Sequence, residues 1–84
     1  MNRTLLLAHL ASAERHVLLD EARLANQEAL LARLERSGHP TDAASELLAT
    51  MRQTQALHVE DRDRIRRELE HLEARAVEAG ARRN

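Results

Sequence analysis

The sequence of 84 residues contains no cysteine, no lysine, one proline and no phenylalanine, tyrosine or tryptophan. The absence of thiols excludes disulfides, zinc–thiolate sites and a cysteine nucleophile. The absence of aromatic rings excludes the stacking surfaces on which proteins usually bind single-stranded nucleic acid. The formal net charge of −1 argues against a general binder of polyanions.

Leucine and alanine dominate what is present. Each supplies 15 positions, and all 13 basic residues are arginine. Leucine, alanine, glutamate, arginine and glutamine favour helices, whereas only Val17, Val59, Val77 and Ile65 are β-branched aliphatic residues. The composition therefore predicts an all-α protein.

Glycine and proline mark the ends of the predicted helices. Gly38 can adopt the left-handed conformation that ends a helix, and Pro40 cannot continue one. Thr41 is a suitable N-cap for the next helix, and Gly80 repeats the stop signal. We expect a single domain over 1–84, an antiparallel two-helix hairpin. It comprises a helix over about 3–37, a turn at 38–41, a helix over about 42–79 and a frayed tail at 80–84.

Both predicted helices carry a heptad row, the pattern of helices packed side by side. In the first helix the row is Leu6, Leu10, Ala13, Val17, Asp20, Leu24, Gln27, Leu31 and Leu34. In the second it is Leu48, Met51, Gln55, His58, Arg62, Ile65, Leu69, Leu72 and Ala76. Both rows, which together form the inner seam, are apolar at their ends and polar near their centres.

Two registers of the hairpin are consistent with these rows. If facing residue numbers add up to 82, Asp20 meets Arg62 and Gln27 meets Gln55. A tighter turn gives sums of 78–79, with Asp20 opposite His58 and Arg62 opposite an apolar residue. We favour the first register because it leaves no charge facing hydrocarbon.

The central polar residues of the inner seam are the candidate site. Asp20, Arg62, Gln27, Gln55 and His58 are interpreted as a polar layer that fixes the register of the helices. The alternative is a site with chemistry, because His16 and Asp20 are one turn apart and His58 lies across from them. These three are the candidate metal ligands of this site, and a nearby Arg62 would repel a cation. We expect no metal and no cofactor.

In a two-helix hairpin of this size, the free energy gained by burying side chains rarely outweighs the conformational entropy lost on folding, unless a further interaction stabilises the fold. The first helix carries a second apolar row, here called the alanine stripe: Leu7, Ala11, Leu18, Ala22, Ala25, Ala29 and Ala32. Small side chains let another helix approach closely. We therefore expect a homodimer in which the first helices face each other, giving a four-helix bundle.

The remaining patterns favour a non-enzymatic role through protein contacts, as an adaptor or small regulator. No serine–histidine–aspartate arrangement, glycine-rich phosphate loop or paired-carboxylate cleft is present in the sequence. The alternative is weak nucleic-acid binding through the basic face Arg62–Arg67, although acidic residues interleave with its arginines. A single Glu68-x-x-His71 has di-iron spacing but flanks the inner seam. The expected partner is a second copy, with another protein as a further possibility.

The N-terminal region imitates a secretory signal, but its apolar stretch is short and His9 interrupts it. No segment approaches the ~20 apolar residues of a membrane span. We therefore expect a cytoplasmic protein with no membrane partner.

Several segments resemble a group of short, uncharacterised bacterial helical-hairpin proteins. These segments are Glu14–His16, Leu34–His39, Thr41, Ala44, Leu47–Leu48, Leu57–His58, Arg62–Arg64 and Glu68–Leu69. The resemblance covers about residues 10–70 and implies a small intracellular bacterial protein. Because the group has no assigned activity, it gives no residue a role.

Overall fold

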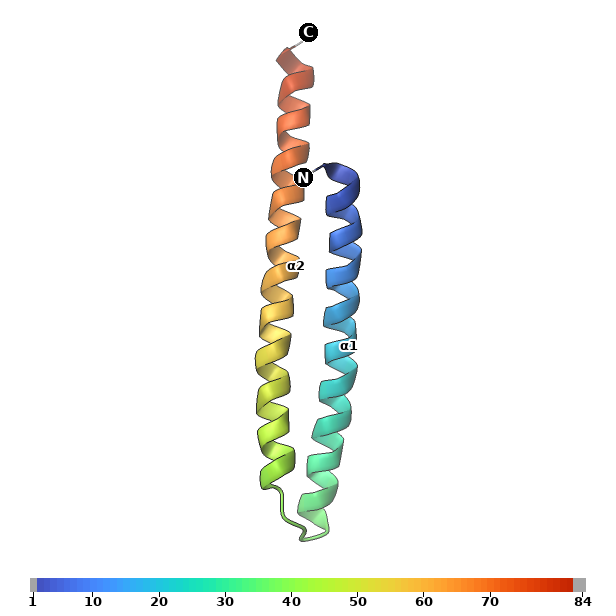
Figure 1. The fold of residues 1–84 in the computed structure, drawn as a ribbon, viewed down its shortest axis with the longest axis vertical. Coiled ribbons are helices and arrows are strands. Elements are labelled where there is room, and N and C mark those ends of the chain that lie inside the picture. Colours follow the sequence, from blue (N-terminus) through green and yellow to red (C-terminus); the bar gives the residue numbers. More distant parts are fainter. Residues whose placement is uncertain (1, 83–84) are drawn as a thin grey trace.

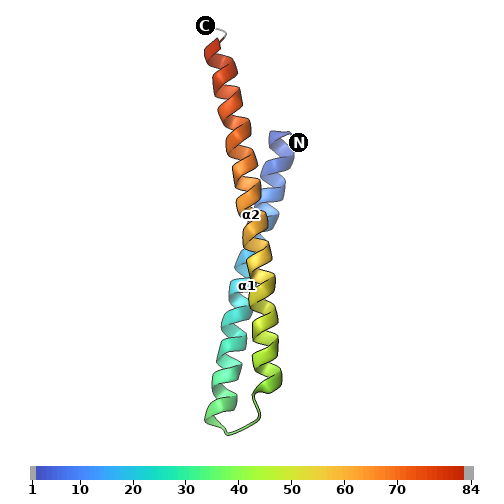
Figure 2. The same ribbon diagram turned by 90° about the vertical axis from the view of Figure 1, so that its left-hand side faces the viewer.

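The computed structural model describes residues 2–82, which form two long helices and no strand. Helix α1 spans Arg3–Arg36 and helix α2 spans Asp42–Arg82. They run antiparallel over most of their length, cross at a shallow angle, and α2 continues well beyond the start of α1 (Figures 1 and 2). The molecule measures 71 × 16 × 14 Å. The all-α prediction is confirmed.

Both helices begin directly after a polar residue in the N-cap position. The Asn2 side-chain oxygen accepts from the Leu5 N–H at 2.8 Å, which caps the first turn of α1. The Thr41 carbonyl accepts from the Ser45 N–H at 2.9 Å, so Thr41 occupies the N-cap position of α2. Sequence analysis identified Thr41 but did not use Asn2, although asparagine is among the best N-cap residues.

The turn between the helices begins with a Schellman motif. Gly38 has φ +71°, the only positive φ among the described residues. The His39 N–H donates to the Leu34 carbonyl at 3.0 Å, and the Gly38 N–H donates to that of Glu35 at 3.2 Å. These bonds satisfy carbonyls that the helix end would otherwise leave free. Gly38 therefore ends α1 as its sequence context predicts.

Gly80 does not end α2, in contrast to the prediction of a stop and a frayed tail. The helix continues through Gly80 to Arg82, whereas residues 83–84 lie outside the described part. An isolated glycine costs only about 1 kcal/mol relative to alanine in a helix. Ala79 and Ala81 on either side are strong helix formers, and no proline follows that would force a stop.

The core of the hairpin is a single narrow line along the contact between the helices. Its buried apolar residues are Leu6, Ala13, Val17, Leu24, Leu48 and Ile65, and Asp20 and Gln27 are the buried polar ones. All eight belong to the predicted inner seam. No large side chain in the described part is completely enclosed. The hairpin thus has one apolar layer and no second layer to cover it.

The favoured register is wrong, and the tighter alternative is present. Asp20 contacts His58, four residues or about one turn before Arg62. Arg62 instead turns to its neighbour Asp63, whose Oδ1 accepts from Nε at 3.0 Å. The tighter register places Arg62 opposite an apolar residue, which would be costly if its guanidinium pointed into the seam. Because the guanidinium bends to the edge of the interface, that cost does not arise.

Candidate functional site

The polar centre of the inner seam is built around one buried carboxylate. Asp20 lies one turn after His16 on α1, and its side chain is only 7% exposed. Its Oδ2 lies 2.5 Å from Nδ1 of His58 on α2. No buried side-chain nitrogen or oxygen in the described part lacks a hydrogen-bond partner. The Asp20–His58 contact therefore satisfies the acid inside an otherwise apolar layer.

His16 completes this cluster from the α1 side. Its ring centroid lies 5.2 Å from that of His58, and the two ring planes are tilted by 37°. The His58 side chain is 35% exposed, so its outer edge reaches the surface beside His16. The structure thus brings together the three residues that sequence analysis named as candidate metal ligands.

These three residues are not arranged as the ligands of one ion. Within residues 2–82, no group of three or more histidine, aspartate or glutamate side chains could hold a metal. The Asp20 oxygen that would be a ligand already binds His58 Nδ1. The geometry fits a cross-helix hydrogen bond that joins the two helices at this layer and satisfies the buried carboxylate.

The second polar layer also differs from the prediction. Gln27 does not pair with Gln55; its Nε2 donates to the backbone carbonyl of Ala44 at 2.9 Å. Ala44 lies in the first turn of α2, so this bond ties α1 to the start of the second helix. Sequence patterns could not identify this partner, because every residue has a backbone carbonyl.

The basic face Arg62–Arg67 is largely neutralised by its acidic neighbours. Arg64 binds Asp61 and Glu68 on the same helix, and the hydrogen bond to Asp61 raises the pKa of Arg64 above its usual value. Arg62 binds Asp63, as described above. The arrangement is that of a solvated, ion-paired helix face, and it does not favour the nucleic-acid alternative.

One edge of the hairpin carries ion pairs that sequence analysis missed. Glu28 of α1 lies 3.5 Å from Arg52 of α2, and Glu14 lies 3.9 Å from Arg66. The two glutamates are 14 residues apart on α1, and the two arginines are 14 residues apart on α2, a separation of two heptads. This spacing was a readable signal, because residues at one heptad position share one edge of a helix. A further pair, Arg3–Glu73, lies near the open end of the hairpin at 3.4 Å.

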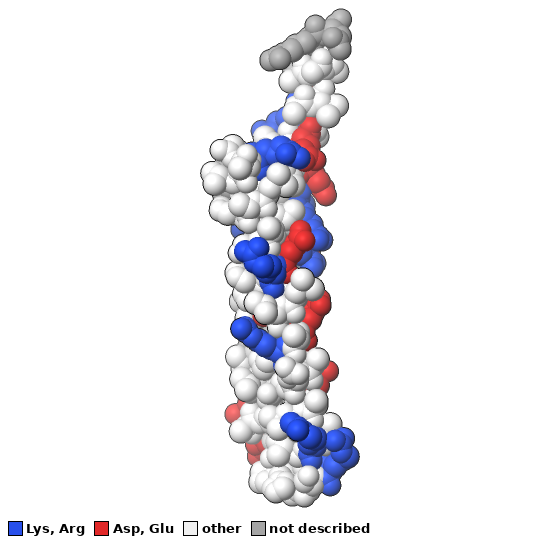
Figure 3. All heavy atoms as spheres, turned by 90° about the vertical axis from the view of Figure 1, so that its right-hand side faces the viewer, with Lys and Arg blue, Asp and Glu red and all other residues white. Residues whose placement is uncertain are grey.

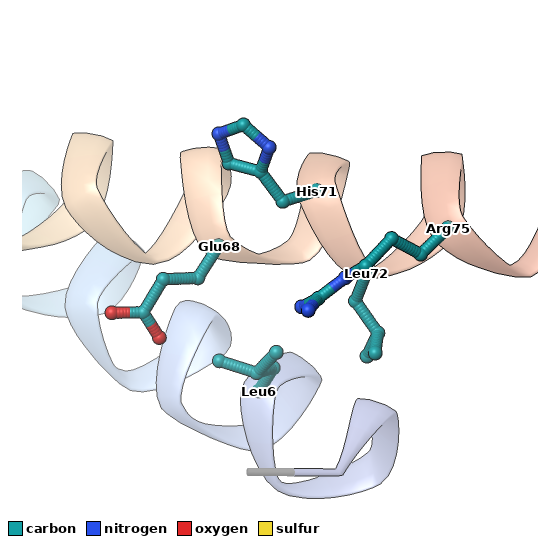
Figure 4. A pocket seen from close by; sticks show the side chains of 5 residues that line it. All are labelled: Leu6, Glu68, His71, Leu72 and Arg75. Carbon is teal, nitrogen blue, oxygen red and sulfur yellow. The ribbon is translucent and has the colours of Figure 1, made fainter.

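The grooves between the helices are shallow and mixed in character. Figure 4 shows one of them, in which Leu6 of α1 approaches Leu72 of α2 while Glu68 points towards α1. His71 points away from α1, so Glu68 and His71 do not converge on one point. The Glu-x-x-His spacing therefore does not form an inward-facing pair in this hairpin.

The outer face of α1 is exposed and consists mainly of alanine and leucine, with single arginines among them. Of the alanine stripe, every member is exposed except Ala32, which is half-buried. Leu18 is 64% exposed and Leu19 beside it 51%. Figure 3 views the hairpin from the α1 side: uncharged residues cover most of this face, arginine atoms form several separate patches on it, and acidic atoms lie mostly along one edge. Sequence analysis thus identified a surface that the hairpin itself leaves open.

Comparison with protein-family models, curated proteins and solved structures finds no match for this chain. The resemblance to short bacterial hairpin proteins therefore stays a prediction. Within residues 2–82, neither helix has a stretch that is both long and apolar enough to cross a membrane.

Proposed function

We propose that the protein is a self-associating, non-enzymatic helical module that acts through protein–protein contacts, as an adaptor or small regulator. The observation that carries this proposal is the exposed outer face of α1, which consists mainly of alanine and leucine. In this arrangement α1 packs against α1 of a second copy, and each α2 lies on the outside.

The thin core supports association. The hairpin buries six apolar side chains along one line and leaves several large ones exposed by half or more, among them Leu18, Leu19 and Leu57. Small domains with so little buried area usually need a disulfide, a metal or a partner chain for stability. The sequence has no cysteine, so a disulfide cannot supply this stability.

The length of α1 supports a second copy as the occupant. A helix of 34 residues is about 50 Å long and about 10 Å wide, so two such helices can bury on the order of 1,000 Å² in total. That area reaches the lower bound for a specific interface. Because the open face of α1 lies nearly opposite its inner seam, the four helices would form a flattened bundle.

Light scattering on the intact chain tests the proposal. We expect the mass of two 9.5 kDa chains at micromolar concentration. Ala22→Glu places a charge in the middle of the α1 face and should give the mass of one chain. The matched control is Ala56→Glu, which changes an exposed alanine on α2 and should leave the dimer intact. A single-chain mass for the unaltered protein overturns self-association.

The adaptor role has its own test, a pull-down from the native host with the intact chain and with Ala22→Glu. An adaptor must recover another protein besides itself, and that recovery should depend on the dimer. Recovery of the chain alone would count against an adaptor and leave a purely structural module.

A further inference from the structure

The outer face of α1 carries a complete second heptad row. This outer row alternates steps of four and three along the whole helix and comprises Thr4, Ala8, Ala11, Arg15, Leu18, Ala22, Ala25, Ala29, Ala32 and Arg36. Every member is exposed except Ala32, which is half-buried. Only two members of its central stretch are bulky, namely Arg15 and Leu18. Because Arg15 and Leu18 do not lie at the middle of the helix, their position determines whether a second copy packs better in the parallel or the antiparallel orientation.

A parallel pair of α1 helices would place identical residues opposite each other. Arg15 would then face Arg15 of the second copy, and Leu18 would face Leu18 in the adjacent layer. The like charges would repel, and two bulky layers would hold apart the alanine layers on both sides, which need a close approach.

An antiparallel pair with the full length of α1 aligned gives the opposite result. Leu18 faces Ala22 of the second copy, Arg15 faces its Ala25, and Ala11 faces its Ala29. Both bulky side chains of the central stretch then meet an alanine, so the central layers can close to a similar distance, and Arg36 faces Thr4 at the two ends. On the neighbouring edge Leu19, which is 51% exposed, lies opposite Leu19 of the second copy and becomes covered.

Charged residues line the other edge of this antiparallel pair, where the acidic row of α1 lies beside the acidic row of the second copy and Arg15 supplies a basic partner. Glu14, Glu21 and Glu28 lie one heptad apart along one edge of α1. The outer two bind Arg66 and Arg52 of α2. At the corresponding heptad position between these arginines α2 carries Val59, so the middle carboxylate faces no arginine. Within residues 2–82, neither Glu21 nor Arg15 forms an ion pair.

Resting on the dimer proposed above, we propose that the two α1 helices pack antiparallel and that Arg15 of each chain pairs with Glu21 of the other. Glu21 is one turn before Ala25, the residue that Arg15 covers, so it lies within reach of the guanidinium. The pairing occurs twice per dimer by symmetry. The shared edge then holds three carboxylates and three guanidiniums from each chain, including the existing pairs with Arg52 and Arg66.

Disulfide trapping tests the orientation, because the natural chain has no cysteine. Ala11→Cys and Ala29→Cys each alter an exposed alanine of the outer row. The two variants are mixed, unfolded and refolded together, and oxidised with oxidised glutathione. The antiparallel dimer should give mainly the mixed disulfide between the two variants. Two copies of Ala11→Cys alone should not cross-link, because their thiols would lie about 27 Å apart along the axis.

Charge reversal tests the ion pair. Arg15→Glu and Glu21→Arg should each weaken dimerisation by roughly 10-fold, and the double variant should return to within about 3-fold of the original. Arg67→Glu on the exposed face of α2 is the matched control and should have no effect. In a parallel dimer the double variant would not be rescued.

The outcomes separate this inference from the proposed dimer. Disulfides that join two copies of the same variant, together with a two-chain mass, would overturn the antiparallel orientation but not the dimer. A two-chain mass without any disulfide overturns the outer row as the interface. A single-chain mass in light scattering overturns the dimer itself, and with it this inference.

Discussion

The two helices of this hairpin have similar compositions but differ in how many partners they can take. Helix α1 is apolar on its inner seam and again on its outer face, whereas the outer face of α2 is densely charged from Glu60 onwards. Those charges pair mostly within α2, as in Asp61–Arg64–Glu68. Three carboxylates of α1 instead reach across to α2, namely Glu14, Asp20 and Glu28, whereas Glu21 and Glu35 form no ion pair within residues 2–82. This difference is the one that the proposed dimer requires, with α2 facing water and the outer face of α1 open to a second copy.

The largest expected effect comes from the inner seam, which both helices share. Ile65→Ala removes a side chain that is only 5% exposed and should lower the free energy of unfolding by about 2–4 kcal/mol. Chemical denaturation followed by circular dichroism measures the loss. A change below about 0.5 kcal/mol would mean that the core does not lie along this seam.

The polar layer should give the next largest effect. Asp20→Ala leaves His58 without its acceptor and should cost about 2 kcal/mol in unfolding free energy, whereas Asp20→Asn retains an oxygen and should cost less. The same denaturation experiment compares both with Glu70→Ala, which alters an exposed carboxylate of α2 and should have almost no effect. Equal stabilities for Asp20→Ala and the unaltered chain would contradict a stabilising role for this cross-helix hydrogen bond.

Two leucines with nearly equal exposure sharpen the contrast between the outer faces. Leu18 on α1 is 64% exposed in the hairpin, and Leu57 on α2 is 65% exposed. Leu18→Ala should weaken dimerisation by about 1–2 kcal/mol per chain, because a second copy covers that side chain. Leu57→Ala should change it by less than about 0.5 kcal/mol. Sedimentation equilibrium measures both, and equal effects would contradict an interface confined to α1.

The ends of the helices give the smallest effects, of opposite sign. Gly38→Ala forces an alanine into a conformation with φ +71° and should destabilise the hairpin by about 1 kcal/mol. Gly80→Ala replaces a glycine inside α2 that has open space around it and should stabilise by a few tenths of a kcal/mol. Thermal unfolding distinguishes them. Destabilisation by both would indicate that α2 also ends at its glycine.

The helices, the turn and the inner seam were predictable because they depend on local signals. The heptad spacing requires only residue types, and the turn requires only Gly38, Pro40 and Thr41 in close succession. The eight buried residues all fall on the predicted seam for this reason. The exposed alanine stripe follows from the same spacing.

The register was not predictable, because two sets of pairings satisfied the polar residues almost equally. The choice between them depended on the Arg62 side chain, which bends to Asp63 and removes the objection to the tighter turn. The spacing of residue types in the sequence does not determine the conformation of one flexible side chain. The Gln27 bond to a backbone carbonyl escapes prediction for a similar reason, whereas the Glu14–Arg66 and Glu28–Arg52 pairs were readable from heptad positions.

The most direct test of a two-sided α1 is the dependence of thermal stability on protein concentration. A protein stabilised by a second copy melts at a higher temperature as its concentration rises. The melting temperature of the unaltered chain and of Ala56→Glu should therefore rise across the micromolar range. That of Ala22→Glu should stay constant at a lower value. A constant melting temperature for the unaltered chain would contradict the account, because the outer face of α1 would then contribute nothing to stability.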